Sequence, residues 1–289
     1  MTWVVWRQHR LEALWALLVA ALLAASIGFV AHQMSISPCP AQASPGGGPV
    51  PGVADCLPSD FWGSLAQGIV RVNLYQYGLV VLPALAGAFV GAPLVAREIE
   101  TGTARLAWTQ GVTRRRWLLV KLGLVFVPLL AGAAVVGILE VLLINVEGPQ
   151  ANRWALFDQQ APMTVGSTAF ALALAVAAGS VLGRSVPAMA AALLGFVVTR
   201  VGIAELARPR YLSPLAFSTN DASAISAMKG SQTAWWLDQF QFRTSVVQAY
   251  HYQPGDRFWT FQAIETAILV GLAAMLVAFT VYWVLRRLG

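Results

Sequence analysis

The chain has 289 residues, of which 57% are hydrophobic and only 11% charged, and its mean hydropathy is +0.64. This hydrophobic fraction exceeds the roughly 45–50% of soluble domains and is gathered into runs of about twenty residues, which excludes a soluble globular protein and predicts an all-α polytopic membrane protein. The 19 Lys and Arg outnumber the 13 Asp and Glu, but they cluster at the ends of the apolar runs, where membrane topology and lipid headgroups explain them, so we expect no nucleic-acid partner.

The sequence predicts a single transmembrane domain over residues 1–289 with six helical spans. Each span is long enough, at about 1.5 Å per residue, to cross a hydrocarbon core of about 30 Å. The first apolar run lacks a small-residue cleavage site followed by a soluble chain, so we expect a retained helix rather than a signal peptide. The spans are expected at 11–31, 77–95, 117–144, 164–182, 186–203 and 261–285.

Residues 32–76 are expected to form an extracellular element between the first two spans. Its first part contains six prolines and three glycines at 46–48, a composition that cannot bury a core. The only two cysteines, Cys39 and Cys56, flank these glycines and are interpreted as a disulfide on an oxidising face; two unpaired thiols are the alternative. Residues 60–75 place apolar side chains at helical spacing, which indicates either a short interfacial helix or an early start of the second span.

The polar segment from Arg97 to Lys121 separates the second and third apolar runs and holds about ten charged groups. Such groups cannot lie in hydrocarbon, so the segment is expected in water beside the membrane, where its arginines favour the cytoplasmic side. A helix is expected from Pro93 to Thr101, with Gly102 as its C-terminal stop.

A short amphipathic helix is expected after this stop, carrying an exposed Leu106 or Trp108 flanked by charges. That arrangement is typical of a docking element for a soluble partner. The arginines at 114–116 are better explained as a topology anchor for the third span. Glu98 and Glu100 remain open between docking residues and solvated surface.

Four ionisable residues lie at costly or borderline membrane depths: Glu140, Arg200, Glu205 and Glu265. Each requires a partner or water there. One interpretation is an ion pair between helices, such as Glu140 with Arg200. The alternative places one or more of them around an outer cavity for a polar or cationic substrate.

Small residues recur at four-residue spacing in two of the spans. Gly87 and Gly91 lie in the second span, and Ala171, Ala175 and Gly179 lie in the fourth. Such stripes permit close helix contacts, either within one subunit or across a dimer.

The outer segment 204–260 is the longest connection and is rich in aromatic residues. Aromatic side chains at this density are expected in elements packed against one another or lying at headgroup depth. The segment therefore indicates either a small extracellular subdomain or a re-entrant helical hairpin.

Charge on alternate sides of the spans predicts the orientation. Placing both termini, the polar segment and the turn at 183–187 on one side gathers eleven Lys and Arg against three Glu there. The positive-inside rule assigns that side to the cytoplasm, so the three remaining loops face outward.

The order EIETGTARLAWTQGVTRRRWLLVKL between the second and third of six spans resembles the permease subunits of ABC exporters of the ABC-2 type. The Trp- and Arg-rich start TWVVWRQHR, the long outer segment before the sixth span and the RRLG tail add to the likeness, which extends over essentially the whole chain. The resemblance implies a multi-pass protein of the bacterial plasma membrane.

In similar permeases, the loop between the second and third spans forms a coupling helix that fits a groove on a nucleotide-binding subunit. The resemblance therefore implies that Glu98, Glu100, Gly102, Thr103 and Arg105 contact the ATPase or shape the loop. It also implies a connecting helix over residues 1–10 at the inner interface. That helix would turn its tryptophans inward and its arginines toward lipid headgroups, with these residues: Trp3, Trp6, Arg7 and Arg10.

The chain itself lacks a phosphate-binding loop. Its only lysines, Lys121 and Lys229, are followed by Leu and Gly rather than by Ser or Thr, and neither follows the required Gly. We therefore expect a non-catalytic subunit that binds no cofactor, with ATP and Mg held by a separate ATPase. Six spans are half of the usual exporter core, so a second copy or a sister permease is expected.

Three other functions remain open at the level of sequence. An ion- or proton-coupled transporter would use Glu140, Glu205 and Glu265 without an ATPase, whereas an intramembrane enzyme lacks a recognisable catalytic motif. A membrane anchor or sensor is the third. The substrate, whether a drug, peptide, lipid or glycan, is not indicated.

Overall fold

The computed structural model of the chain describes residues 60–65, 79–104, 113–147, 153–154, 156–219, 234–241 and 248–287, with ten positions between 21 and 36. Those ten positions are all helical. Most of the first predicted span, and with it the prediction of six spans, lies outside the described residues. So do the following residues named above: Trp3, Trp6, Arg7, Arg10, Cys39, Cys56, Arg105, Leu106 and Trp108.

Five helices among the described residues are long and apolar enough to cross a membrane, and they match the second to sixth predicted spans. Their bounds differ from the predicted ones by a few residues, mostly because the helices continue past the apolar runs. The helices are α3 (Leu79–Ala86), η3 (Gly87–Gly91) and α4 (Ala92–Glu100) in series, α6 (Arg114–Glu147), α7 (Ala161–Leu182), α8 (Ser185–Gly202) with η6 (Ile203–Ala207) and η7 (Arg208–Arg210), and α10 (Phe258–Arg286).

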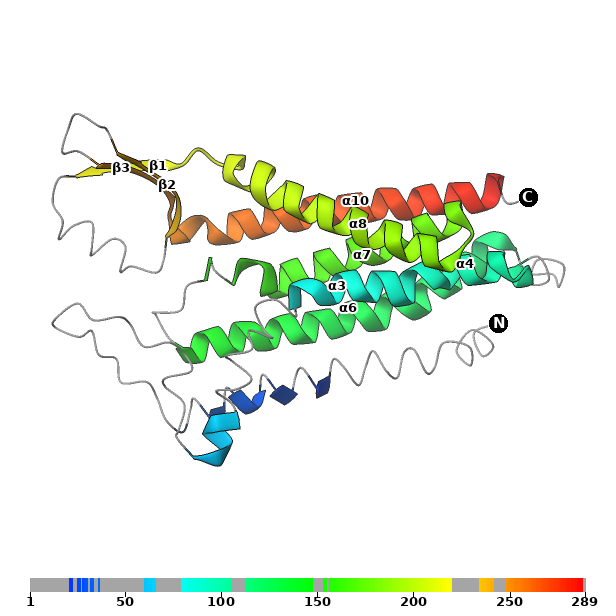
Figure 1. The fold of residues 1–289 in the computed structure, drawn as a ribbon, viewed down its shortest axis with the longest axis horizontal. Helices are drawn as coiled ribbons and strands as arrows, with labels where there is room; N and C mark the ends of the chain where they lie inside the picture. Colours follow the sequence, from blue (N-terminus) through cyan, green and yellow to red (C-terminus); the bar gives the residue numbers. More distant parts are fainter. Residues whose placement is uncertain are drawn as a thin grey trace.

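Helix α7 lies at the centre of the bundle and packs against α10, α6, α8 and α4 (Figure 1). Its sequence is apolar or small on every face, as expected for a helix surrounded by other helices. Left-handed Gly183 ends the helix, and its N–H donates to the Gly179 carbonyl at 3.0 Å. The short turn that follows sends α8 back antiparallel to α7.

The two stripes of small residues face each other within this one chain. A Cβ atom added at Gly87 would lie 2.7 Å from the Ala171 carbonyl oxygen, and one at Gly91 would lie 3.0 Å from the Ala175 Cβ. The second and fourth spans therefore approach so closely that a side chain at Gly87 would collide with the backbone of Ala171 and one at Gly91 would be crowded by Ala175. This settles the choice left by the sequence: the contact is intramolecular.

A three-stranded antiparallel sheet extends beyond one end of the helices (Figure 1). It consists of β1 (Leu215–Thr219), β2 (Trp235–Gln241) and β3 (Gln248–Gln253) in the order β1-β3-β2, with Phe217 opposite Tyr250. The sheet adds strands to a mostly helical protein: in its described part, segment 204–260 forms a small sheet, which fits the predicted subdomain and not the re-entrant helical hairpin. The alternation of Tyr250 and Tyr252 with other residues in β3 is typical of a strand.

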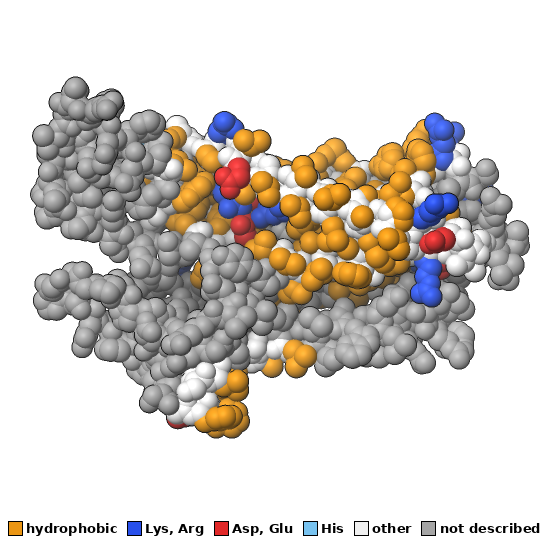
Figure 2. All heavy atoms as spheres, in the orientation of Figure 1, with side chains coloured by type: hydrophobic (Ala, Val, Ile, Leu, Met, Phe, Trp, Pro, Cys, Tyr) orange, Lys and Arg blue, Asp and Glu red, His pale blue; other side chains and the backbone are white. Residues whose placement is uncertain are grey.

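We call this end of the molecule the sheet end and the opposite end, which carries residues Glu98 to Thr103, the motif end. An aromatic cluster joins the sheet to the helices: Trp154 lies 5.5 Å from Trp235 of β2, 5.2 Å from Phe258 and 5.3 Å from Phe261, measured between ring centroids. Figure 2 shows apolar side chains over the middle of the visible face, with charged side chains at both ends of this belt. That distribution fits a bundle surrounded by hydrocarbon and bounded by water.

Candidate functional site

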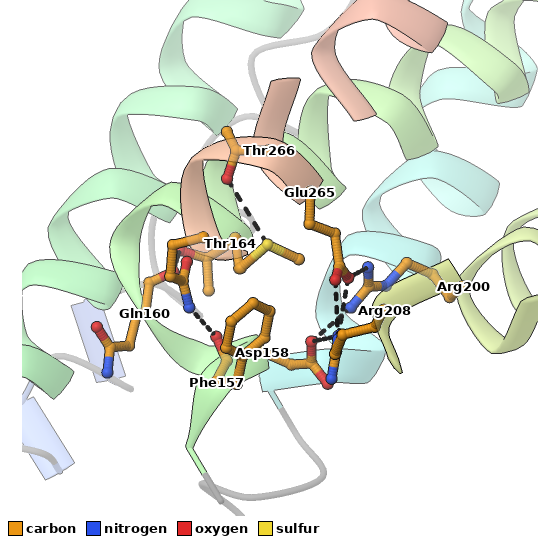
Figure 3. A network of polar contacts seen from close by, with 10 residues as sticks. Phe157, Asp158, Gln160, Thr164, Arg200, Arg208, Glu265 and Thr266 are labelled. Atoms are coloured by element: carbon orange, nitrogen blue, oxygen red, sulfur yellow. Dashed lines mark hydrogen bonds and ion pairs between the residues drawn. The ribbon is translucent and has the colours of Figure 1, made fainter. Parts of the chain in front are cut away.

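Four charged side chains meet at the sheet end of the bundle, and we call them the charge cluster: Asp158, Arg200, Arg208 and Glu265 (Figure 3). Arg200 donates from Nη1 to Glu265 Oε1 and from Nη2 to Asp158 Oδ1, both at 2.7 Å. Arg208 donates from Nη2 to Asp158 Oδ1 at 2.5 Å and to Glu265 Oε1 at 2.8 Å. Its Nε donates to Glu265 Oε2 at 2.8 Å. The cluster is thus one continuous network of charge-assisted hydrogen bonds.

A π-helical turn places the two arginines on the same face. In a regular α-helix, residues eight apart point about 80° away from each other. Between Arg200 and Arg208, the chain forms η6, in which the Arg208 N–H donates to the Ile203 carbonyl five residues earlier. This turn inserts one residue into the helical register, so the angle between the two side chains falls to about 20°.

The other two members come from elements on either side of these arginines. Asp158 belongs to the three-residue turn η5 (Phe157–Gln159) before α7, and Glu265 lies at the start of the third turn of α10. Phe157 secures η5, since its ring lies 4.3 Å from the Arg208 guanidinium and its carbonyl accepts from Gln262 Nε2 at 2.6 Å. The cluster therefore holds the ends of the fourth, fifth and sixth spans together.

Burial is uneven across the cluster. The Glu265 side chain is completely buried, Arg200 and Arg208 are nearly so, and the Asp158 side chain is 29% exposed. Two positive and two negative groups balance, which is the condition under which charges persist in an apolar bundle. Nearby, burial raises the pKa of Tyr211 to about 12, and the negative charge of Glu265 acts in the same direction.

The sequence identified Arg200 and Glu265 but paired Arg200 with Glu140. In the structure, the partners of Arg200 are Glu265 and Asp158, while Glu140 lies buried on α6 and Glu205 is exposed. The pairing differs because Glu265 of α10 and Asp158 of η5 lie against Arg200 at this end. The sequence did not indicate Asp158 and Arg208 as members of the cluster, since both lie just outside the apolar runs.

At the motif end, Glu98 forms a salt bridge with Lys121 of α6. The Lys121 side chain is only 1% exposed; its Nζ also donates to the Leu94 carbonyl at 3.3 Å and lies 4.8 Å from the Trp117 ring centroid. Glu98 therefore has an internal partner that joins the second span to the third. This position was interpreted from the sequence as a docking residue or solvated surface.

Glu100 is connected to a different helix. Its Oε2 accepts hydrogen bonds from the backbone N–H of Ser185 at 3.1 Å and from the Ser185 hydroxyl at 3.0 Å. Ser185 is the first residue of α8, so the carboxylate satisfies a free N–H group at the positive end of that helix. Together, the two glutamates join α4 to α6 and to the α7–α8 turn.

Gly102 ends α4 as the sequence predicted. It adopts φ +73°, a left-handed conformation that glycine reaches without steric cost, and a Cβ added there would meet no atom of the described residues within 4 Å. The Thr103 hydroxyl, within hydrogen-bonding distance of the Thr101 hydroxyl, also donates to the Glu98 carbonyl at 3.4 Å. The turn from Thr101 to Thr103 is exposed and stands at the surface of the motif end.

These features define a polytopic α-helical membrane protein whose ends are organised by charge networks. The chain belongs to the ABC-2 membrane transporter related family, whose model matches residues 11–208. The matched region includes the motif end and, from the charge cluster, Asp158, Arg200 and Arg208. The family is that of permease components of ABC transporters, whose general partner is an ATPase subunit. No curated protein and no solved structure matches the chain.

Proposed function

We infer that this chain is the permease subunit of an ATP-driven exporter and that its motif end receives the movement of a separate ATPase that holds ATP and Mg. The observation that carries this proposal is the double attachment of α4: Glu98 joins it to α6, and Glu100 joins it to the start of α8. A force on the exposed turn from Thr101 to Thr103 would then be transmitted to three spans at once. The positive-inside rule supports placing this end in the cytoplasm.

The exposed turn has the properties of a contact point. Its backbone is turned sharply at Gly102, and no other part of the described structure lies near the missing Cβ of this residue. A partner can therefore approach the backbone closely. Arg105, Leu106 and Trp108, which follow in the sequence, would extend the same surface.

Two variants of one residue test this docking. Gly102→Arg introduces a long charged side chain into the space that a partner would occupy, while Gly102→Ala imposes the backbone strain without the bulk. We expect ATPase activity to copurify with the wild-type chain from native membranes, to be retained at least partly with Gly102→Ala, and to be lost with Gly102→Arg. Equal ATPase activity with wild type and Gly102→Arg would contradict the proposal.

The remaining parts of the proposal rest on the family. They are six spans with both termini in the cytoplasm, pairing with a second copy or a sister permease, location in a bacterial plasma membrane, and outward transport of a drug, peptide, lipid or glycan. The ion-coupled alternative loses support because Glu265, its best-placed carboxylate, accepts hydrogen bonds from both Arg200 and Arg208. Both oxygens of this carboxylate are therefore engaged by arginines of the charge cluster rather than free to hold a coupling ion.

A further inference from the structure

We propose that Arg200 and Arg208 form a binding site for a single anionic group, phosphate or carboxylate, and that Asp158 occupies this site as a built-in competitor in the structure described here. The inference rests on the proposed function only in identifying the ligand as a transported substrate. It adds to that function a chemical class: a molecule with a phosphate or carboxylate group.

The geometry around Asp158 is that of a bound anion. One oxygen, Oδ1, accepts from Nη2 of Arg200 at 2.7 Å and from Nη2 of Arg208 at 2.5 Å. Two guanidinium groups that converge on one oxygen are the arrangement by which proteins hold phosphate and carboxylate ligands. An oxygen of a ligand at this point would meet the same two donors.

Glu265 plays a different part in the cluster. Both of its oxygens accept hydrogen bonds, three in total, and its side chain has no exposed surface. It therefore holds both arginines in place whether or not Asp158 is present. One carboxylate against two guanidinium groups leaves one positive charge, and an uncompensated charge in this environment is costly. The site consequently requires one further anion.

Asp158 is the member most easily replaced by a ligand. It is the most exposed of the four, and it lies on a turn of three residues rather than within a span. The neighbouring Phe157 remains fixed through its buried ring and through the bond from Gln262 to its carbonyl. Asp158 can therefore turn outward by side-chain rotation while the packing beneath Arg208 is kept.

The first experiment measures phosphate binding to the full chain in nanodiscs of zwitterionic lipid at constant ionic strength, by tryptophan fluorescence and by thermal unfolding. Trp154 and Trp235 stack near Phe157 and provide the signal. Asp158→Asn removes the competing charge, so we expect inorganic phosphate to bind about tenfold more tightly than to wild type, the gain expected for one lost charge-assisted competitor. Asp256→Asn, a change of the same kind at an exposed position on η8, should leave the affinity unchanged.

A second arm identifies the source of the anion. The same proteins are compared in buffer free of inorganic phosphate, in nanodiscs with and without phosphatidylglycerol. A larger thermal shift for Asp158→Asn on adding phosphatidylglycerol would assign the site to a lipid headgroup. In either arm, adding Arg208→Gln to Asp158→Asn should remove the gain. If Asp158→Asn binds neither probe more tightly than wild type, the proposal is wrong.

A further variant keeps the test valid if Asp158→Asn does not fold. Gln262→Met removes the hydrogen bond to the Phe157 carbonyl and loosens the turn without changing any charge. We expect a smaller gain in phosphate affinity in the same direction, and no gain would overturn the proposal. These binding measurements need no ATPase. Absence of ATPase copurification would therefore refute the proposed function and leave the anion site standing. Absence of the gain in anion binding would refute the site and leave the proposed function standing.

Discussion

Arg200 and Arg208 are eight residues apart in sequence, yet their guanidinium groups share one oxygen of Asp158 because a π-helical turn lies between them. The turn is therefore as much a part of the cluster as the charged residues are. Unusual helical turns of this kind are frequent at functional sites. The relationship can be tested without touching any charged residue.

Deleting Ala204 from η6 should remove the inserted residue and leave a regular α-helical turn there. The two arginines would then be seven residues apart, an offset of about 20° in an α-helix, so they should stay on one face. We expect the thermal midpoint of the purified chain to fall much less for this deletion than for Arg208→Gln, which removes the contacts of Arg208 with Glu265 and Asp158. A fall as large as that of Arg208→Gln would show that the register of the two arginines is not what the π-helical turn provides.

The buried carboxylate of Glu265 should contribute more to folding stability than the partly exposed carboxylate of Asp158. Glu265→Gln leaves Arg200 and Arg208 with a neutral amide in place of their buried carboxylate. Breaking a buried charge network of this kind costs about 3–5 kcal/mol of folding stability. Scanning fluorimetry in detergent should therefore show a larger fall in the thermal midpoint for Glu265→Gln than for Asp158→Asn. The double variant Arg200→Met, Glu265→Met should recover part of the loss. An equal fall for both single variants would contradict this ranking.

The sequence was sufficient to predict the five helical spans that lie among the described residues, since each is an apolar run bounded by charged residues, and it also predicted Gly102 as the end of a helix. The partners of the charged residues were not predictable in the same way. Lys121 resembles one more cytoplasmic anchor in the sequence, but the packing of α4 against α6 buries it beside Glu98. Asp158 and Arg208 enter the charge cluster only through a short turn and a π-helical turn, and neither has a reliable sequence pattern. The sheet was not predicted because the aromatic residues of segment 204–260, which strands favour, were interpreted only as packing or headgroup residues.

Removing one partner of the Glu98–Lys121 salt bridge should lower the thermal midpoint more than removing both partners. Glu98→Gln leaves the Lys121 ammonium buried with a weaker partner, so we expect a clear fall in the thermal midpoint. Lys121→Met in addition should restore most of it, because a methionine of similar length fills the space beside Trp117. If the double variant is no more stable than Glu98→Gln, the charge pair is not what stabilises this contact.

The same double variant separates stability from coupling. If the salt bridge transmits force from the exposed turn to α6, the folded double variant should keep its ATPase partner while substrate-stimulated transport in proteoliposomes declines. Unchanged transport would limit the pair to a structural role.

Gly179 provides the sharpest test of the central helix contact. A Cβ at this position would lie 2.5 Å from the Ala92 carbonyl oxygen, so Gly179→Ala must push α4 and α7 apart. Overpacking of this kind costs about 1–3 kcal/mol, and the thermal midpoint should fall. The matched control is Gly271→Ala in α10, where an added Cβ meets nothing within 4 Å in the part of the chain that the structure describes. There the change should raise stability slightly, by about 0.5–1 kcal/mol, because glycine is unfavourable inside a helix. Opposite signs for one substitution at two glycines would demonstrate that close backbone contact, rather than flexibility, requires Gly179, whereas a rise at both positions would disprove the contact.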